Sequence, residues 1–177
     1  MLLTVGHGTA TREELVALFR SAGIASLVDV RRFPGSRRHP HAGRDRLQEW
    51  LQDVGVAYRW EERLGGRRRR QPDSPNGGLR NASFQAYADH LDSDEFRDAI
   101  AGVLDEAERG TTAIMCSESL WWRCHRRLIA DYVTLLTDVG LRHLLHDGRL
   151  AEHVPTDVVR VSDGRLVYDG GTPAMEL

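Results

Sequence analysis

Short apolar segments alternate with amphipathic ones along the first 146 residues, and this alternation restricts the fold more than any other feature of the chain. The spacing predicts five buried strands, at residues 2–5, 24–30, 56–60, 112–116 and 142–146. Helices are predicted at about 12–22, 44–54, 82–91, 94–109 and 121–137. Strands separated by helices favour right-handed crossovers, so we expect an α/β fold, a three-layer sandwich with a mainly parallel sheet of about five strands.

The last part of the chain has a different pattern. Two short alternating segments flank Ser162-Asp163-Gly164, which predicts a small C-terminal β-hairpin at about 157–169. No repeat or linker divides the sequence, and we expect residues 1–177 to form a single α/β domain. No stretch of apolar residues is long enough for a membrane span or a signal peptide, so we expect a cytoplasmic protein without a membrane partner.

The basic residues are concentrated in the middle of the chain. All 24 are arginines, and 13 of them lie between residues 31 and 80 against six acids, a net charge of +7, while the remaining residues carry −9. Most of this charge falls on two predicted basic loops, at about 31–43 and 61–80. Such a patch favours an anionic partner, either a phosphorylated small molecule or nucleic acid. The alternative is a solvated arginine-rich loop.

The second basic loop, from about 61 to 80, is long for a connection in a compact domain. It contains four consecutive arginines, Arg67 to Arg70, between Gly-Gly pairs and prolines. We expect a mobile lid whose arginines an anionic ligand orders, and the alternative is an arm that is permanently packed against the body.

Reactive side chains fall at the carboxyl ends of several predicted strands, where open parallel sheets bind their ligands. His7 follows the first strand, Asp29 and Arg31 the second, and Cys116 and Glu118 the fourth. We therefore expect these residues to meet in one active site. The alternative is that they are the polar loop residues of any α/β fold.

Cys116 is the expected nucleophile. It ends an apolar strand shortly before a helix that carries Arg123 and Arg126, which predicts a thiol pKa below the ordinary value of about 8.5. Glu118 is a candidate general base or metal ligand beside the thiol, and His7 and Asp29 complete the candidate catalytic set. An inert buried cysteine is the alternative for Cys116.

Cysteine and histidine also raise the question of a divalent metal as cofactor. Cys116, Cys124 and His7 are candidate ligands for zinc or iron, although their spacing matches no standard zinc motif. Cys124 and His125 are neighbours in the predicted helix and should diverge by about 100°, so we expect that the two ligate one metal only with difficulty.

Several residues around this centre are candidates for holding the ligand. An indole at the mouth of the crevice suits stacking on a nucleobase, and arginines suit phosphates. The candidate set is Arg31, Arg37, Arg38, Arg67, Arg80, Arg123, His125, Arg126 and Trp121.

Six motifs together resemble the DUF488 family of small bacterial and archaeal proteins, over residues 4 to about 153. They are Thr4-Val-Gly-His7, Val28-Asp-Val-Arg31 with Phe33-Pro-Gly-Ser36, Leu64-Gly-Gly-Arg67, Gly78-Leu-Arg-Asn81, Met115-Cys-Ser-Glu118 and Arg123-Cys-His-Arg126. The resemblance implies an α/β domain with a shared site, and it supplies no reaction. One departure is Trp121, where the family pattern often has proline.

The leading hypothesis is an enzyme, a hydrolase or transferase, that acts on a nucleotide, nucleic acid or other phosphorylated ligand with a Cys/Glu/His centre. Two rivals stay open. One is a non-catalytic nucleic-acid-binding module, and the other is a metal-dependent enzyme or sensor that uses the Cys and His residues.

Overall fold

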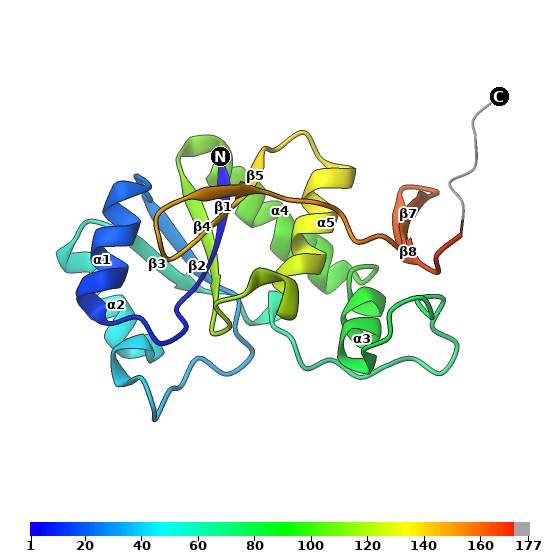
Figure 1. Ribbon diagram of the computed structural model, residues 1–177, viewed down its shortest axis with the longest axis horizontal. Helices are drawn as coiled ribbons and strands as arrows, with labels where there is room; N and C mark the ends of the chain where they lie inside the picture. The colour runs from blue at the N-terminus through cyan, green and yellow to red at the C-terminus, as the bar shows by residue number, and fades with distance from the viewer. Residues whose placement is uncertain (172–177) are drawn as a thin grey trace.

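The computed structural model describes residues 1–171 and contains a six-stranded sheet with the strand order β3-β2-β4-β1-β5-β6 (Figure 1). The first five strands are parallel, and only β6 runs antiparallel to its neighbour β5. The strands are β1 (Leu2–Gly6), β2 (Ser26–Asp29), β3 (Ala57–Trp60), β4 (Thr112–Cys116), β5 (Leu141–Leu144) and β6 (Leu150–Glu152). The five predicted strands are confirmed. The sixth has only three residues, too few for an alternating pattern to show.

Helices cover both faces of this sheet, as the three-layer prediction requires (Figure 1). They are α1 (Arg12–Ser21), α2 (Arg44–Asp53), α3 (Ala82–His90), α4 (Asp94–Arg109) and α5 (Arg126–Leu136). Side chains alternate along β1, so Leu3 and Val5 pack with α1 and α2 while Leu2 packs with α4 and α5. None of the helices within residues 1–171 has both the length and the apolar character needed to cross a bilayer.

Helix α5 begins five residues later than the sequence predicts. A 3₁₀ turn, η3 (Trp121–Arg123), comes first, and Cys124 then has an extended backbone, with φ −125° and ψ 153°. The Trp121 ring is stacked on the His143 ring of β5, with centroids 3.9 Å apart and an interplanar angle of 4°. This tertiary contact holds the turn out of the helix, and no local pattern reveals it.

The predicted C-terminal hairpin is confirmed as β7 (Val159–Ser162) and β8 (Arg165–Tyr168). Its turn residues Asp163 and Gly164 have φ values of 50° and 72°, as a two-residue hairpin turn requires. The hairpin contacts the long basic loop, because the Tyr168 amide donates to Asn76 Oδ1 at 3.0 Å and the Gly78 amide donates to the Tyr168 carbonyl at 2.8 Å.

Side chains anchor the 61–80 loop at several points, which favours the packed arm over the mobile lid. Asp89 of α3 accepts hydrogen bonds from the Gln71 amide at 3.0 Å, from Ser74 Oγ at 2.5 Å and from Asn76 Nδ2 at 2.8 Å.

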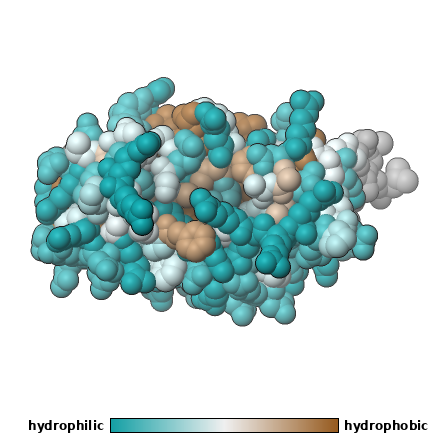
Figure 2. All heavy atoms as spheres, turned by 90° about the horizontal axis from the view of Figure 1, so that it is seen from below, coloured by the Kyte–Doolittle hydropathy of each residue, from teal (hydrophilic) through white to brown (hydrophobic). Residues whose placement is uncertain are grey.

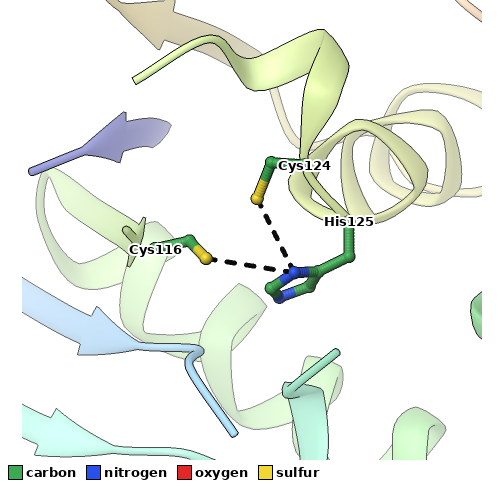
Figure 3. A group of neighbouring side chains, drawn as sticks. All are labelled: Cys116, Cys124 and His125. Atoms are coloured by element: carbon green, nitrogen blue, oxygen red, sulfur yellow. Dashed lines mark hydrogen bonds between the residues drawn. The ribbon is translucent and has the colours of Figure 1, made fainter. Parts of the chain in front are cut away.

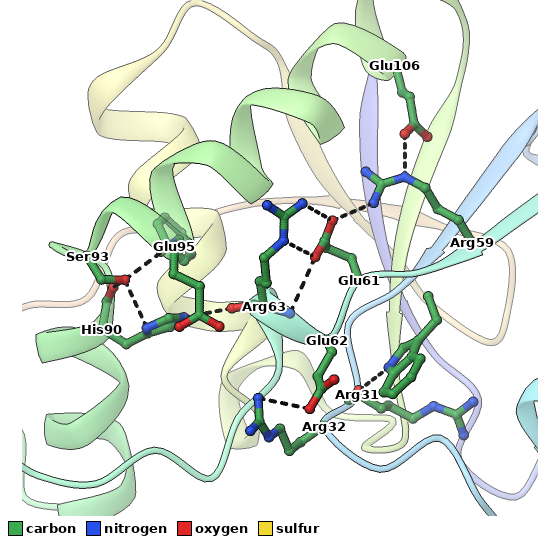
Figure 4. Close-up of polar contacts among 12 residues, drawn as sticks. Arg31, Arg32, Arg59, Glu61, Glu62, Arg63, His90, Ser93, Glu95 and Glu106 are labelled. Carbon is green, nitrogen blue, oxygen red and sulfur yellow. Dashed lines mark hydrogen bonds and ion pairs between the residues drawn. The ribbon is translucent and has the colours of Figure 1, made fainter.

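The start of the same loop is held by Glu61, whose carboxylate pairs with Arg59 and Arg63, both at 2.8 Å (Figure 4). Arg59 of β3 also forms an ion pair with Glu106 of α4 at 2.5 Å. Burial raises the pKa of Glu61, but its hydrogen bonds to Arg63 and Arg59 outweigh burial and leave that pKa below its usual value. The loop therefore enters from a fixed point on the sheet edge.

Candidate functional site

A cleft of about 740 Å³ opens at the carboxyl ends of the parallel strands. Its walls come from the loops after β1, β2 and β4, from residues 66–67 of the long basic loop and from the start of α3. These loops lie at the bottom of Figure 1, and Figure 2 views the molecule from that side. Hydrophilic side chains cover most of this face, with smaller hydrophobic patches near its middle (Figure 2).

Most of the predicted site residues meet in this cleft. Its lining includes His7, Arg31, Arg38, Arg67, Cys116, Glu118, Arg123, Cys124 and His125. The other predicted residues, which are absent from the lining, are Asp29, Arg37, Arg80, Trp121 and Arg126. The edge rule for parallel sheets thus brings the strand-end residues together, whereas arginines from the loops are divided between the cleft and the outer surface.

Asp29 and Arg31 form a buried ion pair at the base of the cleft. Asp29 is 0% exposed and Arg31 3% exposed. The carboxylate receives the Arg31 Nε at 2.8 Å, the Arg31 Nη2 at 2.5 Å and the Tyr58 hydroxyl at 2.9 Å. Burial and the Asp29 charge raise the pKa of Tyr58. With its oxygens engaged in this way, Asp29 positions Arg31 and has no direct access to a ligand in the cleft.

His7 lies on the other side of Arg31. Its Nδ1 faces the Gly8 carbonyl at 3.0 Å, and since a carbonyl only accepts, Nδ1 carries the proton and Nε2 presents its lone pair to Arg31 Nη1 at 3.4 Å. Burial, followed by the nearby Arg31 charge, lowers the pKa of His7 to about 4. His7 is therefore neutral at pH 7 and is available as an acceptor.

Cys116, Cys124 and His125 point toward one another in the same cleft (Figure 3). The His125 Nδ1 lies 4.0 Å from Cys116 Sγ and 3.6 Å from Cys124 Sγ, and all three atoms lie within 4.8 Å of one another. The other ring nitrogen, Nε2, donates to the Val30 carbonyl at 3.0 Å. Nδ1 therefore turns an unprotonated lone pair toward the two sulfurs in the neutral ring.

The expectation that Cys124 and His125 diverge is wrong. It assumed that both residues are helical, but Cys124 has an extended backbone and only His125 is at the helix start, as the cap of α5. The 100° rotation of a helix does not apply across this junction, and the two side chains converge on Cys116. His125 thus takes the place that the sequence analysis gave to His7 in the candidate metal group, which within residues 1–171 contains Cys116, Cys124 and His125.

The surroundings shift the pKa values of the two thiols in opposite directions. A hydrogen bond between the sulfurs, followed by burial, raises the pKa of Cys116 well above its usual value. The same hydrogen bond lowers the pKa of Cys124, and the contacts of Cys124 with His125 and with Arg126 Nε, 3.4 Å from its sulfur, act in the same direction. The predicted low pKa at Cys116 is therefore wrong, because the neighbouring Cys124 sulfur and burial outweigh the effect of Arg126 there.

Arg126 is 1% exposed and acts from behind the cleft. It contacts the Cys124 sulfur and donates through Nη2 to the carbonyl of Glu118, so it fixes the loop after β4. A Cβ on Gly6 would collide with both the Glu118 carbonyl and Arg126 Nη2, which explains the glycine at the end of β1. The Glu118 side chain is exposed, and its Oε1 accepts from the Leu120 amide at 3.3 Å.

Three arginines on the cleft rim have no carboxylate partner within 4.0 Å among residues 1–171: Arg38, Arg67 and Arg123. Arg67 has φ 60°, a strained backbone for a large side chain, and its guanidinium lies 5.6 Å from the centre of the Phe33 ring. Phe33 is 65% exposed and also lines the cleft. Strain and an exposed aromatic ring at one rim are typical of a binding surface.

Sequence reasoning assigned no role to several lining residues, among them Phe33, Arg32 and Tyr87. Phe33 entered the sequence analysis only as part of the Phe33-Pro-Gly-Ser36 motif, and its place directly after Arg31 and Arg32 was the available signal. Tyr87 packs its ring 4.9 Å from the His125 ring and donates from its hydroxyl to the Leu64 carbonyl at 2.6 Å. It fixes the imidazole from the α3 side.

Comparison with known proteins gives one match. The family described as "Domain of unknown function DUF488" matches residues 11–133, which include the cleft residues from Arg31 to His125. Comparison with curated proteins and with solved structures gives no match.

Proposed function

Because the chain belongs to the DUF488 family, whose description assigns no reaction, its activity has to be inferred from the cleft, and we propose an enzyme that acts on a nucleotide, a nucleic-acid strand or a similar phosphorylated ligand. One observation carries the proposal: a single cleft is lined by five arginines and one carboxylate, and it ends at a pair of thiols beside an imidazole. Arginine is suited to phosphate because its planar fork binds two oxygens at once.

The arginines of the cleft divide into held and uncommitted side chains. Arg31 is paired with the buried Asp29. Arg32 is paired with Glu62 at 3.2 Å (Figure 4). Arg38, Arg67 and Arg123 are the ones available for an incoming anion. Three such cations suit a diphosphate or two neighbouring phosphates of a strand.

Phe33 favours a ligand that carries a base over bare phosphate. The exposed ring lies at the cleft mouth with Arg67 above it. An aromatic face next to a guanidinium is the usual arrangement for stacking a nucleobase while its phosphate is neutralised, and such stacking contributes about 1 to 3 kcal/mol per base.

Binding tests the first half of the proposal. We expect labelled single-stranded oligonucleotide and inorganic pyrophosphate to compete for one site, and we expect Arg38→Gln, Arg67→Gln and Arg123→Gln each to weaken both. The matched control is Arg46→Gln, an exposed α2 arginine paired with Glu49 outside the cleft. Equal affinity in all four variants would contradict the proposed anion site.

Salt dependence identifies the length of strand in contact. The log-log slope is about −0.7 per phosphate neutralised on single strands, so three rim arginines predict a slope near −2. A much steeper slope that the rim variants do not change would place the contacts outside the cleft.

Turnover tests the second half. Nucleotides and short oligonucleotides incubated with the wild type should give a product that the Cys124→Ser variant does not form, while both proteins bind the substrate. Binding without turnover across the panel would overturn the enzyme and leave the nucleic-acid-binding module, the rival that the basic loops also support.

A further inference from the structure

The geometry points to a mononuclear site for a thiophilic divalent metal, Zn²⁺ in the first place, formed by Cys116, Cys124 and His125 with its fourth position open to the cleft. The site deepens the proposed function, on which it rests only for the ligand that would take the open position.

The donor distances match a tetrahedral centre. With Zn–S of about 2.3 Å and Zn–N of about 2.0 Å, such a centre separates sulfur from nitrogen by about 3.5 Å and the two sulfurs by about 3.8 Å. The Cys124 Sγ lies 3.6 Å and the Cys116 Sγ 4.0 Å from His125 Nδ1, and no pair exceeds 4.8 Å. Small side-chain rotations therefore suffice to bring all three atoms onto one ion.

The imidazole is held as metal-binding histidines are held. Its Nε2 donates to the Val30 carbonyl at 3.0 Å, which fixes the tautomer that leaves the Nδ1 lone pair free. The Tyr87 ring supports it from the side at 4.9 Å between centroids. A disulfide between the two cysteines would need neither this tautomer nor this orientation, so the placement of the nitrogen favours a metal over a redox pair.

The charge around the sulfurs suits two thiolates. Two thiolates and one divalent cation are neutral together, and Arg126 Nε, 3.4 Å from the Cys124 sulfur, donates a hydrogen bond of the kind that supports a ligating thiolate. Arg126 is itself held by the Glu118 carbonyl, so this donor is fixed before any metal arrives.

The fourth position faces the cleft. All three residues line it, and the cluster found within residues 1–171 has no fourth His, Cys, Asp or Glu. Three protein ligands with one free position are typical of catalytic rather than structural zinc sites. The uncommitted arginines border the same cleft, so a phosphoryl oxygen is the ligand class that fits the open position.

Metal analysis of reduced protein tests the site. We expect one Zn²⁺ per wild-type chain after purification without chelator, and Co²⁺ in its place should give visible bands together with thiolate-to-metal charge-transfer absorption. Cys116→Ser, Cys124→Ser and His125→Asn should each lower Zn²⁺ affinity by more than about 100-fold, because even outer partners of a metal site contribute about 10- to 100-fold. His39→Asn is the matched control, a cleft histidine outside the cluster that should keep full metal content.

Two results would overturn the site. One is reduced wild-type protein that takes up neither Zn²⁺ nor Co²⁺, and the other is unchanged Zn²⁺ affinity in the three ligand variants. The cobalt spectrum of the wild type keeps the test valid even if a variant fails to fold.

Pyrophosphate separates this inference from the proposed function. A cobalt spectrum that shifts when pyrophosphate binds supports both. Metal uptake by a protein that binds neither pyrophosphate nor oligonucleotide supports the metal site and overturns the anion function. Anion binding by a protein that takes up no cobalt supports the anion function and overturns the metal site.

Discussion

Replacing Asp29 should destabilise the protein far more than removing Asp29 and Arg31 together. The Asp29→Leu variant leaves the Arg31 guanidinium, 3% exposed, without its carboxylate. Breaking a buried pair by removing one partner costs about 3 to 5 kcal/mol, mainly because an uncompensated charge stays buried. For a domain of this size, 1 kcal/mol corresponds to about 2 to 4 °C, so Tm should fall by roughly 6 to 20 °C.

The double variant Asp29→Leu with Arg31→Met removes the charge as well as its partner, and it should recover a large part of that loss. Tyr58→Phe removes one hydrogen bond to the carboxylate, 2.9 Å long, and should cost about 1.5 kcal/mol. The control is Glu49→Ala, which breaks an exposed pair with Arg46 and should change stability by less than about 0.5 kcal/mol.

Urea unfolding followed by far-UV circular dichroism gives these free energies. The informative quantity is the difference between Asp29→Leu and the double variant at equal m-value. If the double variant is no more stable than Asp29→Leu alone, then Arg31 is not held by Asp29, and the description of Asp29 as a positioning residue fails.

Three further predictions concern the rest of the molecule. Gly6→Ala forces a Cβ into the loop after β4 and should cost about 1 to 3 kcal/mol, whereas Gly140→Ala, which faces open space, should be nearly neutral in the same thermal melts. Burial, then nearby His and Arg charges, lowers the pKa of His143 to about 3. As the pH falls, the unfolded chain therefore protonates His143 at a higher pH than the folded chain does. The free energy of unfolding should decrease from pH 6.5 toward pH 3 by up to about 1.4 kcal/mol per pH unit. The His143→Asn variant should show a shallower decrease. Asp89→Ala leaves three donors unpaired, and amide exchange across residues 71–78 should accelerate; unchanged exchange would show that the arm is anchored elsewhere.

Sequence patterns predicted the parts of the site that depend on strand ends. The five apolar segments and the rule for parallel sheets were enough to bring His7, Arg31 and Cys116 to one edge. These residues follow strands whose direction and neighbours are fixed by burial, so their position along the chain determines their position in space.

The parts that depend on loop orientation could not be predicted in this way. Arg38 lines the cleft and Arg37 does not, although the two are adjacent, because the direction of a side chain in an irregular loop follows no period. The convergence of Cys124 with His125 depends on the stacking of Trp121 on a strand that comes 20 residues later in the sequence, a contact that local spacing does not encode.

The bond between Tyr168 and Asn76 has a consequence for the order in which the protein is made. These residues are 92 positions apart, and their contact joins the hairpin to the arm that leads into the cleft wall. The ribosome releases the arm early, yet its partner emerges only near the end of synthesis, and at about 5 to 20 residues per second this leaves a delay of several seconds. During that interval the sheet can pack its helices and Asp89 can already hold residues 71–76, whereas the hydrogen bonds between the arm and Tyr168 form only after the hairpin emerges.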